Sequence, residues 1–166
     1  LKVRISDAAD STVVDVSNGT FTVKGKLVLN SPNGGQTWIV GESRNITWTR
    51  TGSIANVKLE YSTDSGVTYP NTIISSTDAA AGSYAWTVPD AIGTTLRVRV
   101  TDASDATVLD TSDNDFTIKG SLTLTAPNGG EAWVVGSAYD ITWTKTGTIS
   151  TVKLEYSTNG FSDELE

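Results

Sequence analysis

The feature of this chain that most constrains its fold is an internal repeat with a period of 95 residues. The tetrapeptide Pro-Asn-Gly-Gly at residues 32–35 returns at residues 127–130. Aligned without gaps, residues 1–66 match residues 96–161 at 14 of the first 25 positions and at 23 of the next 41, which gives 37 of 66. Because chance does not produce such a match, the folding unit to be sought is the repeat rather than the whole chain.

The frame of the repeat divides the chain into three parts. Residues 1–25 match the end of a copy, residues 26–120 form one complete copy, and residues 121–166 match the beginning of a third. We therefore expect the chain to be an excerpt of a longer tandem array. The junctions at Gly25 and Gly120 contain almost no linker. An elongated array in which each copy contacts mainly its neighbours is the expected result.

Within the complete copy, apolar and polar residues alternate with the period of two that is typical of β-strands. Val, Ile, Thr, Tyr and Trp are frequent and suit strands. No segment shows helical periodicity. The predicted strands cover residues 27–30, 44–49, 56–62, 67–75, 84–88, 96–100 and 116–118.

Seven short strands, each with one apolar face, predict an all-β fold. The favoured architecture is an immunoglobulin-like or fibronectin III-like sandwich, repeated in tandem. An up-and-down barrel is the competing architecture, but the uneven loop lengths speak against it. Trp48 and Trp86 are the predicted core anchors that bridge the two sheets. On the strand at 56–62, we expect Lys58 and Glu60 to face water.

Composition excludes several classes of function. The net charge of −7 provides no basic face for the phosphates of a nucleic acid. The chain contains neither cysteine nor histidine, which excludes Cys/His zinc sites and histidine-based catalytic triads. No pair of carboxylates is expected to face each other across a cleft, so we predict that the chain is not an enzyme. No apolar window is long enough to cross a bilayer, and no membrane insertion is expected within this segment.

A set of motifs resembles a known family. The motifs are Pro-Asn-Gly-Gly, Ile-Thr-Trp, Val-Lys-Leu-Glu-Tyr-Ser, Tyr-Ala-Trp-Thr-Val-Pro and Asp-Phe-Thr-Ile. Together they resemble the Ser/Thr-rich, GPI-anchored-type repeat, which includes the N-terminal domain of yeast cell-wall β-glucan assembly proteins and similar repeats of large prokaryotic surface proteins. The resemblance implies an immunoglobulin-like sandwich on a secreted or cell-surface protein. It supplies no catalytic residues, and no anchor signal is visible in this sequence.

An acidic loop is the best candidate for a metal site. Asp102, Asp105, Asp110, Asp113 and Asp115 lie within fourteen residues, and Ca²⁺ favours several oxygen ligands on a flexible loop. Their spacing matches no EF-hand pattern. The alternative is that these side chains cap turns. Calcium is the only cofactor that the sequence suggests.

Two tryptophans are candidates for a ligand platform. Trp38 and Trp133 follow the Gly-Gly turns and could present a ring to a sugar. The alternative is that they cover one end of the sandwich, and packing is the favoured interpretation.

The favoured function is that of a non-catalytic structural spacer in an extracellular array, whose partners are its neighbouring copies. A glycan- or protein-binding adhesion module is the alternative. The incomplete copies at the two ends carry apolar faces and open strand edges. We expect them to be completed either by docking on the complete copy or by head-to-tail strand addition between molecules.

Overall fold

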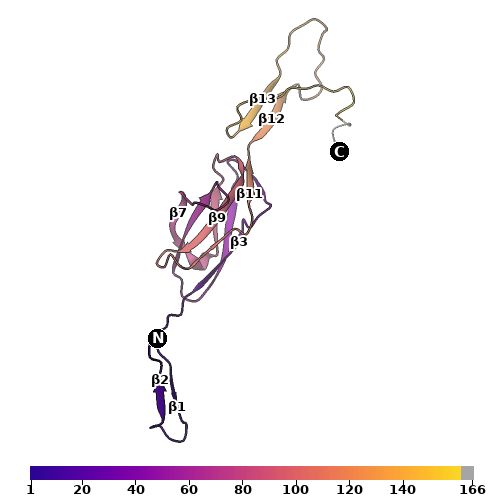
Figure 1. Ribbon diagram of the computed structural model, residues 1–166. Coiled ribbons are helices and arrows are strands. Elements are labelled where there is room, and N and C mark those ends of the chain that lie inside the picture. Colours follow the sequence, from indigo (N-terminus) through magenta and orange to yellow (C-terminus); the bar gives the residue numbers. More distant parts are fainter. Residues whose placement is uncertain (162–166) are drawn as a thin grey trace.

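The computed structural model describes residues 1–161, and its regular secondary structure consists almost entirely of β-strands (Figure 1). In this described part, the only helical element is a single 3₁₀ turn, η1 (Ala79–Ala81). Residues 26–120, here called the central segment, form two sheets around one hydrophobic core. This arrangement is consistent with a β-sandwich and confirms the predicted all-β class.

The first sheet of the central segment contains three antiparallel strands: β3 (Lys26–Ser31), β5 (Ser43–Thr51) and β8 (Ser83–Thr87). The second contains β4 (Thr37–Ile39), β6 (Asn56–Ser62), β7 (Asn71–Asp78), β9 (Gly93–Asp102), β10 (Leu109–Thr111) and β11 (Phe116–Lys119). The strand orders are β3-β5-β8 and β4-β11-β9-β6-β7, and β10 also pairs with β9. Only β4 and β11 run parallel. Consequently β8 and β7 are edge strands of their sheets.

The alternation of the sequence decides which side chains enter the core. Val57 and Leu59 on β6, and Val98 and Val100 on β9, are fully buried between the sheets. Trp48 and Trp86 are buried as predicted. The Trp48 indole Nε1 donates a hydrogen bond to the Ala79 carbonyl at 3.0 Å, so its polar atom is satisfied inside the core.

The strand predicted at residues 67–75 is displaced, because the turn before it is longer than expected. The Asp64 carboxylate accepts hydrogen bonds from the backbone N–H and the hydroxyl of Thr68, at 2.9 and 2.6 Å. Ser65 and Gly66 have φ angles of 58° and 84°. These bonds close the turn around Asp64, and β7 begins only at Asn71. Strands β4 and β10 were not predicted, since three residues are too few to show alternation.

The prediction that Glu60 faces water is wrong. Glu60 is only 6% exposed. It lies on the face of β6 opposite the core, where Lys58 and Arg99 cover it. Alternation identified the correct face of the strand, but it does not show whether charged neighbours bury a side chain there.

The two ends of the chain form separate hairpins. Strands β1 (Arg4–Ser6) and β2 (Val14–Val16) make one two-stranded sheet, and β12 (Ser121–Ala126) and β13 (Thr142–Thr146) make another. They lie at opposite ends of the central segment (Figure 1).

Their pairing follows that of the central strands at an offset of 95 residues. Leu124 pairs with Trp143 as Leu29 pairs with Trp48, and each ladder has a register shift directly after the leucine. Ile5 pairs with Asp15 as Val100 pairs with Asp110.

Candidate functional site

The predicted calcium ligands do not converge on one point. Asp102 and Asp105 cap turns within their own loop by accepting hydrogen bonds from Ser104 and Thr107. Asp105 also forms an ion pair with Lys24 at 2.9 Å. Among the described residues, no three or more acidic side chains are grouped so that they could hold a metal ion.

The remaining three aspartates fasten the Pro-Asn-Gly-Gly turn to the second sheet. Asp110 accepts a hydrogen bond from the Leu29 backbone N–H at 2.7 Å. Asp113 accepts from the Asn33 side-chain amide, and its own N–H donates to Asn33, both at 2.8 Å. The backbone carbonyl of Asp115 accepts from the Gly35 N–H. Its carboxylate pairs with Arg97 at 2.6 Å and accepts from the Ser65 hydroxyl at 2.8 Å. The carboxylates of these three residues thus bind groups outside their own loop, which differs from the turn-capping alternative.

The two candidate tryptophans have different environments. Trp38 is only 5% exposed, and its ring packs against Trp86 and Phe116, with centroid separations of 6.0 and 5.1 Å. It cannot offer a ring face to a sugar, and the packing alternative applies. Trp133 is exposed and stacks flat on Tyr139 at 4.9 Å. Trp38 and Trp133 therefore do not form a common platform for a ligand.

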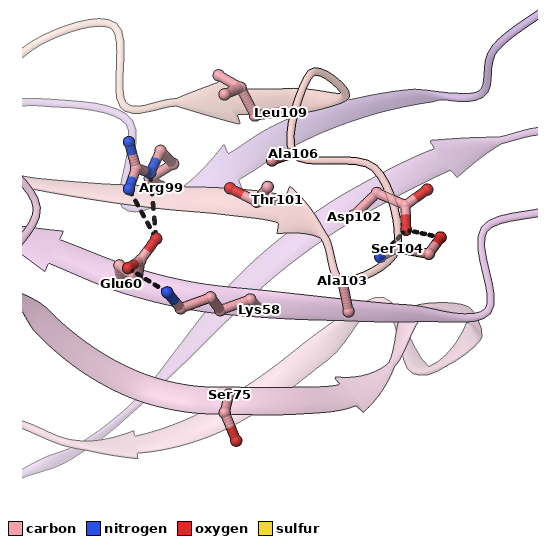
Figure 2. A pocket seen from close by; sticks show the side chains of 10 residues that line it. All are labelled: Lys58, Glu60, Ser75, Arg99, Thr101, Asp102, Ala103, Ser104, Ala106 and Leu109. Carbon is pink, nitrogen blue, oxygen red and sulfur yellow. Dashed lines mark hydrogen bonds and ion pairs between the residues drawn. The ribbon is translucent and has the colours of Figure 1, made fainter.

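A polar hollow on the outer face of the second sheet was not foreseen (Figure 2). It encloses about 370 Å³ and lies over β6 and β9, with β7 and β10 on either side. Lys58, Glu60, Arg99 and Thr101 point into it from the strands, and the loop at residues 102–106 forms one wall. The sequence pattern could not reveal it, because Glu60 and Arg99 lie far apart in the sequence and meet only when β6 pairs with β9.

The ion pairs at Glu60 dominate the electrostatics of the hollow. Its carboxylate accepts from Lys58 at 2.6 Å and from Arg99 Nη2 at 2.7 Å. Burial raises the pKa of Glu60, but the hydrogen bonds from Lys58 and Arg99 outweigh this effect, and the pKa lies below its usual value. Arg99 also lies 4.3 Å above the Tyr69 ring. Glu60 is thus held as a carboxylate with both oxygens engaged.

Thr101 provides a testable feature of the hollow. Its hydroxyl is buried, and it is the one buried side-chain polar atom without a hydrogen-bond partner in the described chain. Since an unsatisfied buried hydroxyl costs stability, Thr101→Val is expected to raise the free energy of unfolding by about 1 kcal/mol. The exposed Thr72→Val change on β7 is the control and should have little effect. A loss of stability in Thr101→Val, measured by urea unfolding, would show that the hydroxyl has a partner such as bound water.

The aspartates of two exposed turns should make the stability of the protein depend on pH. Hydrogen bonds from Ser62 and Thr68 lower the pKa of Asp64 to about 2, and those from Thr107 and Lys24 lower the pKa of Asp105 to about 2. Because both values lie below the unfolded value of about 3.9, their stabilisation is present above that pH and is lost as the pH falls towards 2. We expect the urea concentration at the midpoint of unfolding to fall as the pH is lowered from about 4 towards 2. In Asp64→Asn the fall should be shallower, and an unchanged pH profile in that variant would contradict the assignment.

The junction at Gly25 is in direct contact with the central segment. Lys24 pairs with Asp105 and also donates to the Thr107 hydroxyl. Gly25 lies against Ile54, where an added Cβ would come within 2.7 Å of the Ile54 side chain. A residue larger than glycine therefore cannot occupy this junction without a shift of Ile54.

The junction at Gly120 makes contacts from the other side. The Asp90 carboxylate accepts from the backbone N–H and the hydroxyl of Thr148, at 3.0 and 2.5 Å. These hydrogen bonds lower the pKa of Asp90 from its usual value. Gly147 approaches Val40 so closely that a Cβ would lie 3.0 Å from it. Residues on both sides of Gly120 thus hold the C-terminal hairpin against the central segment.

No protein-family model matches this chain, and a search of curated proteins found no matching relative. Among the described residues, no helix has the length and apolar character required to cross a membrane.

Proposed function

We propose that this chain is part of a tandem array of immunoglobulin-like repeats that acts as a non-catalytic spacer on a secreted or cell-surface protein. The observation that carries the proposal is the pair of junctions. At Gly120 strand β11 leads into β12 through this single glycine, at Gly25 the segment after β2 runs directly into β3, and at both junctions polar contacts bridge the two copies. A spacer needs such joints, because a flexible linker would not hold its ends apart.

Sequence evidence supports the same proposal. The period of 95 residues relates all three parts of the chain. The resemblance to the Ser/Thr-rich, GPI-anchored-type repeat supports an exported protein with this sandwich. The aspartates predicted as calcium ligands have partners within the protein, and a spacer requires no cofactor.

The joint at Gly120 gives the proposal its test. The chain has no cysteine, so spin labels can be attached to cysteines introduced at the exposed positions Ser76 on β7 and Thr144 on β13. Electron–electron resonance should give one narrow distance distribution. Asp90→Ala removes both hydrogen bonds from Thr148 and should broaden it, whereas the control Asp140→Ala should not. A broad distribution in the unmodified sequence would contradict a spacer role.

The polar hollow favours a second candidate function, the binding of a polar ligand such as a glycan. Lys58 and Arg99 retain N–H groups beyond those that contact Glu60, and the Thr101 hydroxyl is unused. Amide chemical shifts recorded with added monosaccharides test this candidate. Shifts confined to β6 and β9, and lost in Thr101→Val, would support binding.

A further inference from the structure

The polar hollow over β6 and β9 contains a hydroxyl that makes no hydrogen bond. The Thr101 side chain is 8% exposed, and its oxygen is the one buried side-chain polar atom without a partner in the described chain. Leaving a buried hydroxyl unpaired destabilises a protein. A bound molecule that supplies the missing partner would remove this cost, so the hollow has a feature that points to a ligand.

Building on the second candidate function, the binding of a polar ligand, we propose that this hollow binds a neutral, hydroxyl-rich ring such as a hexopyranose and discriminates against acidic and basic sugars. Every residue that lines it lies between positions 58 and 109, within the complete copy of the repeat. Three features lead to this class of ligand: the balance of charges, the hydrogen-bonding groups that are still available, and the apolar part of the lining.

The charges that line the hollow are balanced. Lys58 and Arg99 supply two cations, whereas Glu60 and Asp102 supply two carboxylates. Glu60 is buried and contacts both cations, at 2.6 Å from the Lys58 Nζ and 2.7 Å from the Arg99 Nη2. A ligand carboxylate would therefore lie beside Glu60, and a ligand ammonium beside Lys58 and Arg99. Like charges repel in either case, so an uncharged ligand is favoured.

The polar groups that remain available match neighbouring hydroxyls. Lys58 and Arg99 can only donate, and each has N–H groups beyond those that contact Glu60. One Asp102 oxygen accepts from the Ser104 N–H and hydroxyl, at 2.9 and 2.7 Å, and the other accepts no hydrogen bond from the described residues. Because a hydroxyl both donates and accepts, two adjacent hydroxyls of one ring can accept from a cation and donate to Asp102.

Thr101 offers a further contact to the same ring. It is the partner of Lys58 in the pairing of β9 with β6, so the two side chains are neighbours on the outer face of the sheet (Figure 2). The Thr101 oxygen has almost no surface open to solvent. We therefore expect the flexible Lys58 side chain to move as the ligand enters, so that one ring hydroxyl can bond both residues.

Apolar side chains also line the hollow. They belong to Ala103, Ala106 and Leu109, and Leu109 is 44% exposed. A pyranose has C–H groups on its ring faces and hydroxyls around its rim, so it can place carbon against these side chains while its rim meets the polar groups. The volume of about 370 Å³ lies at the small end of the range of ligand pockets, about 300–1,000 Å³, and suits a ligand of this size.

The polar residues of the hollow recur at the period of 95. Lys58 and Glu60 have the counterparts Lys153 and Glu155, and Arg99, Thr101 and Asp102 have the counterparts Arg4, Ser6 and Asp7. All the charges are thus the same, and a hydroxyl is kept at the position of Thr101. The hollow is therefore a feature of the repeat rather than of one copy.

Amide chemical shifts of the full chain test the proposal. The probes are the methyl glycosides of glucose, galactose and mannose, each compared with its uronic acid and its 2-amino sugar. At least one neutral glycoside should shift amides of β6, β9 and residues 102–106, and should bind at least tenfold more tightly than its two charged relatives. Ala106→Trp changes an exposed residue of the lining, fills the hollow and should abolish these shifts.

Two charge variants should change the preference in opposite directions. Glu60→Gln leaves the cations without a buried carboxylate, so the uronic acid should become the preferred ligand. Lys58→Met removes one cation, so the amino sugar should bind more tightly than before. The Lys58 side chain is 38% exposed, and this variant therefore keeps the test valid if Glu60→Gln does not fold. Lys26→Met, at the exposed start of β3 in the other sheet, is the control and should change none of the affinities.

The possible outcomes separate this proposal from the functions given above. A charged sugar that binds as tightly as its neutral relative would overturn the proposal, while the second candidate function would stand. The same conclusion would follow from a preference that neither charge variant alters, or from shifts that persist in Ala106→Trp. No shift with any of the sugars would reject both the proposal and glycan binding. The stiffness of the Gly120 junction is measured independently, so the spacer proposal is decided separately.

Discussion

Gly34→Ala is expected to destabilise the central segment by about 3 kcal/mol, which combines backbone strain with a steric clash. Gly34 has a φ of 119°, a conformation that residues with a Cβ rarely adopt. An added Cβ would lie 2.4 Å from the Asn114 Cβ and 3.1 Å from its Cα. Because the closest contacts include backbone, no side-chain rotation can relieve them. A decrease in melting temperature of more than about 10 °C should follow in a thermal scan.

The chain contains a matched control for this prediction. Gly129 has a similar φ of 113°, but an added Cβ would meet no atom within 4 Å. Gly129→Ala should leave the melting of the central segment nearly unchanged. If the two variants melted at the same temperature, the contact with Asn114 could not be the cause of the destabilisation.

The strands of the central segment were predictable because alternation reports directly on burial. Val57, Leu59, Val98 and Val100 alternate with polar residues in the predicted strands and are fully buried, whereas Tyr61 in the same pattern is only partly buried. The sheet order was not predictable, since β4 joins β11 across almost the whole length of the central segment. Pairings between distant segments depend on tertiary packing and leave little trace in a local pattern.

For the candidate sites, residue type alone was not enough to assign a role to each side chain. Aspartates were noticed because they are acidic, yet Asp110 binds the Leu29 N–H and Asp113 binds Asn33. The same residue type serves metal ligation and turn capping, and only geometry separates the two roles. Glu60 was expected to face water, because the cations that bury its carboxylate come from β6 and β9 together and their pairing was not foreseen.

Trp48→Ala is expected to lower the free energy of unfolding by about 4 kcal/mol, which is the usual effect of removing a large aromatic side chain from a core. Trp48 is 2% exposed, and its indole also satisfies the Ala79 carbonyl at the start of η1. The matched control is Trp143→Ala, because Trp143 pairs with Leu124 as Trp48 pairs with Leu29 but is 39% exposed. Urea unfolding at low protein concentration should show a large loss of stability for Trp48→Ala and almost none for Trp143→Ala. Equal losses would mean that Trp143 already belongs to a closed core within the single molecule.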